Sequence, residues 1–164
     1  MLIVANGLDR LNHAVASIVR WFTVVMALIQ FGIVVGRYVF GVNSIAAQES
    51  VLYLHAAVFM LGAGYTLLTD GHVRIDIFYA HFSQTFRDRI DLLGHVFLLL
   101  PSMTVLLVWS WPSVRNSWAI LEGPISVGGI EAVFLLKSLI PIFCILLILQ
   151  SLAIVIRLLI PERR

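Results

Sequence analysis

Two histidines are the side chains in this 164-residue sequence best placed to support chemistry within its hydrophobic segments. Two imidazoles on facing helices can serve as the axial ligands of a haem iron. His55 lies about two turns from one end of its segment, whereas His95 lies about one turn from the opposite end. At 1.5 Å per residue, their levels differ by roughly 15 Å, which is too far for one iron. A haem-binding or structural membrane-anchor subunit of a respiratory complex is therefore only the alternative prediction.

The other reactive residues form no pattern that would support catalysis. The sequence has no nucleophile beside a base, no glycine-rich phosphate loop and no cluster of metal ligands. The single cysteine, Cys144, lies in an apolar run and is expected to be a small buried residue. We predict no enzyme activity, no cofactor, no bound metal and no nucleic-acid partner.

The composition predicts an all-α integral membrane protein. Hydrophobic residues make up 60% of the chain, charged residues 12%, and the mean hydropathy is +1.00. A helix needs about 20 mainly apolar residues to cross a bilayer. The sequence contains four such segments, which predict a single membrane domain over residues 1–164. The predicted transmembrane helices are 21–40, 50–68, 92–111 and 132–156. Leu8, Leu11, Val15 and Ile18 share one side of a helix over 6–20, and polar residues that include Asp9 and Asn12 lie elsewhere on it. This pattern predicts either an interfacial helix or, preferably, an extension of the first span.

The positions of the basic residues predict the orientation of the chain. Short loops rich in Lys and Arg stay in the cytoplasm. The longest polar interval, 69–91, contains Arg74, Arg87 and Arg89, and five more arginines fall on the same side. Both termini are therefore predicted to be cytoplasmic. Aromatic or branched residues recur every fourth position in this interval, which predicts an interfacial amphipathic segment between helices 2 and 3. These residues are Phe78, Phe82, Phe86 and Ile90.

Charged residues near the predicted outer ends of the spans require partners or access to water. Arg37 lies near the outer end of span one, and Glu49 at the start of span two is its nearest carboxylate in sequence. We predict either a contact between these two residues or their separate solvation. Lys137 in span four is expected to extend to the outer interface or to meet Glu131.

Small residues on span two predict close helix packing. Ala57 and Gly64 belong to two small-residue pairs seven positions apart, on one face of the helix. Small residues let helix backbones approach in lipid, within the same chain or between chains. The span is expected to end at Asp70 and Gly71, with the glycine in the left-handed conformation. Pro101 is expected to kink span three. Gln30 and Gln150 lie within apolar runs and are interpreted as interhelical hydrogen-bond partners.

Four ordered fragments carry a resemblance to a known family. These are RYVFG at 37–41, QES at 48–50, LGAGY at 61–65 and DGHVRIDIFY at 70–79. Together with four spans, they resemble the DctQ-type small membrane subunit of tripartite ATP-independent periplasmic (TRAP) transporters. The chain departs from many relatives at Ala46–Gln48, where those proteins have a tryptophan and a second glutamate.

The resemblance implies a function and a set of partners. A large membrane subunit would carry an organic acid, such as a dicarboxylate or sugar acid, together with sodium. A periplasmic substrate-binding protein would deliver the acid, and this subunit would hold the large one in the bacterial inner membrane. The inner-loop residues Asp70, His72, Arg74 and Asp76 would contact the large subunit or lipid headgroups. The alternative for these four residues is a solvated loop whose charges only set the topology.

Overall fold

Four long helices account for most of the protein. The computed structural model describes residues 2–72 and 81–160, and this part of the chain contains helices and no strand. Four helical segments in it are long and apolar enough to cross a membrane, as predicted, and they contain the expected spans to within one residue. The elements are α1 (Leu2–Phe40), α2 (Ile45–Leu68), α4 (Gln84–Leu93), the π-helical turn η1 (Gly94–Leu99), α5 (Leu100–Ala119) and α6 (Val133–Leu159).

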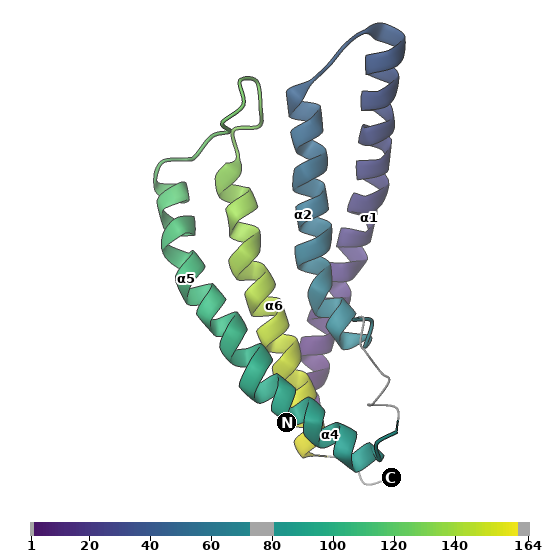
Figure 1. The fold of residues 1–164 in the computed structure, drawn as a ribbon, viewed down its shortest axis with the longest axis vertical. Helices are drawn as coiled ribbons and strands as arrows, with labels where there is room; N and C mark the ends of the chain where they lie inside the picture. Colours follow the sequence, from purple (N-terminus) through teal and green to yellow (C-terminus); the bar gives the residue numbers. More distant parts are fainter. Residues whose placement is uncertain (1, 73–80, 161–164) are drawn as a thin grey trace.

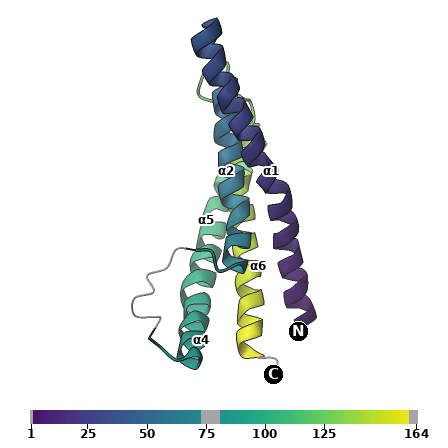
Figure 2. The ribbon, with the colours of Figure 1, turned by 90° about the vertical axis from the view of Figure 1, so that its right-hand side faces the viewer.

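The helices form two hairpins that meet along α6. The α1–α2 hairpin and the α5–α6 hairpin come together where α1 begins and α6 ends, and they diverge toward the opposite end (Figures 1 and 2). We call the end of the molecule where α1 begins and α6 ends the terminal end, and the opposite end the loop end. Helix α6 packs against α1, α2 and α5, and contributes half of the buried residues in the described part of the chain. The cytoplasmic location of the terminal end stays a prediction.

The predicted extension of the first span is part of one continuous helix. Helix α1 has 39 residues, and at 1.5 Å per residue it is about 58 Å long, well beyond a hydrocarbon core of about 30 Å. Its first turns include the buried residues Ala5 and Asn12. The extension therefore belongs to the packed core of the protein, where it contacts α6.

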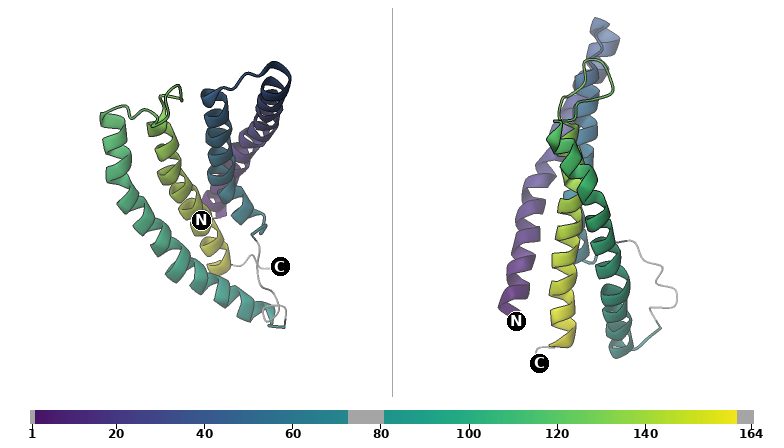
Figure 3. Two further views of the ribbon diagram at one scale, coloured as in Figure 1. Left: turned by 45° about the horizontal axis from the view of Figure 1, so that its top comes forward. Right: turned by 90° about the vertical axis from the view of Figure 1, so that its left-hand side faces the viewer.

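The third membrane-spanning helix is continuous from α4 through η1 to α5. In the π-helical turn the Leu100 N–H bonds to the His95 carbonyl, and Pro101, which has no N–H to donate, follows immediately. The helix curves along this path (Figure 3). Phe82 and Phe86 are exposed, with their rings 4.7 Å apart. Phe78 lies outside the described residues, and the interfacial location of this segment stays a prediction.

The end of α2 corrects one expectation. The left-handed residue is Asp70, with φ of 56°, whereas Gly71 was predicted there. The Gly71 N–H donates to the Thr66 carbonyl at 2.8 Å, and the Asp70 N–H donates to the Leu67 carbonyl at 3.3 Å. These two bonds form a Schellman motif, in which the left-handed residue comes one position before the last donor. A short polar side chain such as Asp tolerates that conformation.

Candidate functional site

A buried polar cluster connects α1 to α6 at the terminal end. We call Asp9, Asn12, Gln150 and Arg157 the polar joint. The Asn12 Nδ2 donates to the Gln150 Oε1 at 2.8 Å, and the Gln150 Nε2 donates to the Asp9 Oδ1 at 3.0 Å. The side chains of Asn12 and Gln150 are 0% exposed. A buried amide without partners is costly, so this pairing fixes the two helices in one relative position.

An ion pair extends the polar joint toward the end of α6. The Arg157 guanidinium donates to the second carboxylate oxygen of Asp9 and to the Asn6 Oδ1, the latter at 3.0 Å. Gln150 and Arg157 are seven residues apart, which is about two helical turns, so both face α1. Charge-assisted hydrogen bonds of this kind are stronger than neutral ones. The joint therefore combines a buried amide pair with a half-exposed ion pair.

Helix α2 completes the joint because Gly64 has no side chain. Gly64 and Ala57 are the buried residues of α2. A Cβ at Gly64 would overlap the Asn12 Oδ1 and would lie 3.3 Å from the Leu146 Cβ. The Asn12 amide thus occupies the space that glycine leaves. At Gly64, the small-residue face of α2 meets α1 and α6 of the same chain.

The two histidines considered for haem face different helix seams. The His95 Nδ1 lies 2.9 Å from the Ser151 Oγ, between η1 and α6. His55 is exposed on α2 and lines a cavity shared with α1. Within residues 2–72 and 81–160, no group of three or more His, Cys, Asp or Glu side chains could hold a metal ion.

Glu49 joins the two hairpins at the loop end, which corrects the predicted contact with Arg37. The Glu49 carboxylate accepts hydrogen bonds from the Ser126 Oγ at 2.7 Å and from the Ile130 N–H at 2.6 Å. Arg37 instead donates to the Asn43 Oδ1 at 3.2 Å. The start of α2 faces the loop between α5 and α6, so loop donors reach Glu49 where Arg37 does not.

Lys137 does not form the predicted contact with Glu131, which was one of its two expected arrangements. Its Nζ lies 2.5 Å from the Glu122 Oε2, in the loop that precedes α6, and does not pair with Glu131. Both side chains of the ion pair are about one-third exposed. The hydrogen bond from Lys137 lowers the pKa of Glu122 below its usual value. Folding brings Glu122 to Lys137 because the start of the loop after α5 lies against the start of α6, where the Val133 N–H donates to the Glu122 carbonyl at 3.1 Å.

The remaining predicted residues lie in the segment after α2. Asp70 and His72 are exposed at the terminal end. Arg74 and Asp76 lie outside the described residues. The proposed role of these four residues in ordering the inner loop stays a prediction.

The two α1 residues of the polar joint, Asp9 and Asn12, were not predicted from the sequence as partners of α6. Gln150 was interpreted as an interhelical hydrogen-bond partner, and this is confirmed. Asp9 and Asn12 were placed on the polar side of the N-terminal segment. The available signal was their spacing of three residues, which puts both on one helix face, opposite a Gln and an Arg seven residues apart on α6.

The fold and the joint define a multi-pass helical membrane protein whose buried polar groups connect its own helices. The family model for tripartite ATP-independent periplasmic transporters, DctQ component, matches residues 25–160. The chain belongs to this family and is the small membrane subunit of a TRAP transporter, which confirms the resemblance. No individual curated protein matches the chain significantly. Members of this family are components of transporters, so the match gives no support to the alternative prediction of a haem-binding subunit. The matched range begins after Asn12, so the α1 half of the joint lies outside it.

Proposed function

We propose that this subunit is a static scaffold for the large membrane subunit of the transporter. In this function, the large subunit carries an organic acid such as a dicarboxylate or sugar acid, coupled to sodium, and a periplasmic binding protein delivers the acid. The chain acts as one four-helix domain over residues 1–164 in the bacterial inner membrane, with both termini in the cytoplasm.

The polar joint is the observation that carries this proposal. A scaffold must keep its helices in register while a neighbouring subunit moves. Sliding α1 along α6 would separate Asn12 from Gln150 and leave buried amide groups without partners, which costs about 1–3 kcal/mol for each group. The joint therefore favours a fixed arrangement of the two hairpins.

The exposed surface of the helices suits lipid and a membrane partner. In the described part of the chain, α5 packs mainly against α6 among the long helices, and its outer side presents Val105, Val108 and Trp109. Large apolar side chains also cover much of α1, for example Leu28 and Phe31. Such surfaces associate with neighbouring helices through packing in the bilayer.

Charged residues at the two ends would position the other partners. Glu49 and Lys137 hold the loop end, where the binding protein would approach the complex. Asp70, His72, Arg74 and Asp76 would order the inner loop against the large subunit or lipid headgroups.

Substitution of Gly64 tests the scaffold. We expect Gly64→Ala to reduce both co-purification of the large subunit and solute uptake by the reconstituted three-component system, because the new Cβ overlaps Asn12. Gly32→Ala is the control, since Gly32 is another helical glycine at which a Cβ meets no atom within 4 Å. Uptake that proceeds equally well without this chain, or accumulation of solute by this chain alone, would contradict the proposal.

A further inference from the structure

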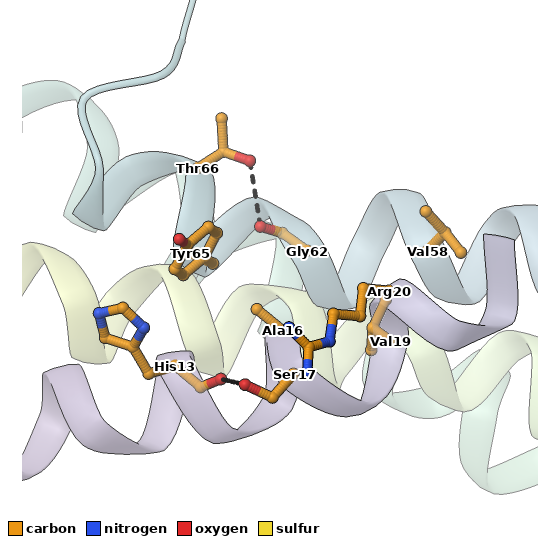
Figure 4. A pocket seen from close by; sticks show the side chains of 9 residues that line it. All are labelled: His13, Ala16, Ser17, Val19, Arg20, Val58, Gly62, Tyr65 and Thr66. Atoms are coloured by element: carbon orange, nitrogen blue, oxygen red, sulfur yellow. Dashed lines mark hydrogen bonds between the residues drawn. The ribbon is translucent and has the colours of Figure 1, made fainter. Parts of the chain in front are cut away.

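A polar pocket lies between α1 and α2 near the terminal end. Its volume is about 440 Å³. Figure 4 shows the side chains that line it, and no carboxylate is among them. The polar lining consists of His13, Ser17, Arg20, Tyr65 and Thr66.

The lining favours an anion. The hydroxyls of Ser17 and Thr66 donate to backbone carbonyls of their own helices, at 2.8 Å and 3.1 Å. The donors left for a ligand are the Arg20 guanidinium, the His13 imidazole and the Tyr65 phenol, and the His13 and Tyr65 rings lie 5.0 Å apart. A guanidinium binds phosphate through two parallel hydrogen bonds.

The position of Arg20 calls for an anionic partner. A cation on a membrane-spanning helix is costly unless it is paired or reaches the interface. Among the described residues, no carboxylate forms an ion pair with Arg20, whose guanidinium lies 5.8 Å from the Trp21 ring centroid. Side chains on a helix lean toward its N-terminus, so Arg20 extends back toward the terminal end. Thr66 lies two residues before the end of α2, and the pocket therefore opens close to the level of lipid headgroups.

A second, largely apolar cavity lies farther along the same seam between α1 and α2. This cavity is about 520 Å³ in volume and is lined by Met26, Ala27 and Leu52, among others. Ala27 follows Arg20 by seven residues, which is two helical turns and about 10 Å, so both lie on one face of α1. His55 and Gly62 of α2 have the same spacing, with His55 at the cavity and Gly62 at the pocket. The seam thus offers an anion site and, about two helical turns farther toward the loop end, a largely apolar cavity.

We propose that this seam binds one phospholipid from the leaflet at the terminal end. The phosphate lies in the polar pocket on Arg20, His13 and Tyr65, and one acyl chain fills the apolar cavity. A free phosphate ion would leave the apolar cavity unused, and a transmembrane helix would leave Arg20 without an anion. The site does not depend on the scaffold function.

Native mass spectrometry of the full-length protein, released from nanodiscs that contain phosphatidylglycerol, tests the site. We expect Arg20→Gln to lower the bound phospholipid about tenfold or more, because a charge-assisted contact is lost. Arg10→Gln is the control, since Arg10 is an exposed cation of the same helix that does not line the pocket. Ala27→Phe places a ring in the apolar cavity without touching the phosphate contacts, and should also lower phospholipid binding.

Three outcomes would overturn the proposal. Equal phospholipid retention by Arg20→Gln and the unsubstituted protein would exclude the headgroup contact. Inorganic phosphate that displaces the bound species, combined with no effect of Ala27→Phe, would indicate a phosphate-ion site instead. Loss of the large subunit from Arg20→Gln with unchanged phospholipid would show that a partner helix occupies the seam.

Discussion

The two ends of the molecule connect the same two hairpins by different means. At the terminal end, the link runs between side chains of α1 and α6, and its amides are fully buried. At the loop end, Glu49 of α2 binds a hydroxyl and a backbone N–H of the loop between α5 and α6. The helices lie close together at the first end and diverge toward the second (Figure 1).

The difference shows where the rigidity of this protein comes from. A buried hydrogen bond between two helices cannot be replaced by water when it breaks, whereas polar groups in a partly exposed loop can be solvated. We therefore expect the terminal end to determine global stability and the loop end to control only local order.

The largest effect is expected at the polar joint. Gln150→Leu would leave the Asn12 Nδ2 and the Asp9 carboxylate without their buried partner, and should destabilise the protein by on the order of 2 kcal/mol. Thermal unfolding in detergent measures this change. Gln30→Leu is the matched control, because Gln30 is an exposed glutamine on α1. Equal unfolding temperatures for the two variants would show that the joint does not hold the hairpins together.

A smaller and local effect is expected at the loop end. A Cβ on Gly129 would overlap the Glu49 carboxylate, so Gly129→Ala should displace that carboxylate and free the Ile130 N–H. We expect faster hydrogen exchange at Ile130, by about fivefold for a contact worth about 1 kcal/mol, with little change in global unfolding. Gly123→Ala is the control, because a Cβ there meets nothing within 4 Å. A large loss of global stability in Gly129→Ala would remove the contrast between the two ends.

The smallest effect concerns the acid dependence of the ion pair between Glu122 and Lys137. The pKa of Glu122 is lowered in the folded protein, so its contribution to stability is complete above the usual value of 4.5 and is lost as the pH falls through the folded pKa. Lys137→Met should return the pKa of Glu122 toward its usual value, as followed by NMR titration of the carboxyl carbon. Arg115→Met, which removes another cation of the outer region, should leave the titration unchanged. An unaltered Glu122 titration in Lys137→Met would exclude the ion pair.

Charged residues near the membrane interface show the limit of prediction from sequence. Proximity in sequence predicts Glu49 as the partner of Arg37, but Glu49 bonds to Ser126 and Ile130, far away in the sequence. The partner of Lys137 was likewise sought at Glu131, although the turn after α5 brings Glu122 to it. Sequence distance did not reveal which loop lies over which helix end.

The four membrane-spanning helices and their approximate limits were determined by the sequence alone, because the length of an apolar segment is set by the thickness of the bilayer. Family membership also followed from local fragments in the right order. The pairing of Asn12 with Gln150, and the need for glycine at position 64, were decided only by tertiary structure. Periodicity tells which residues share a helix face, but the faces that meet depend on how all the helices pack together.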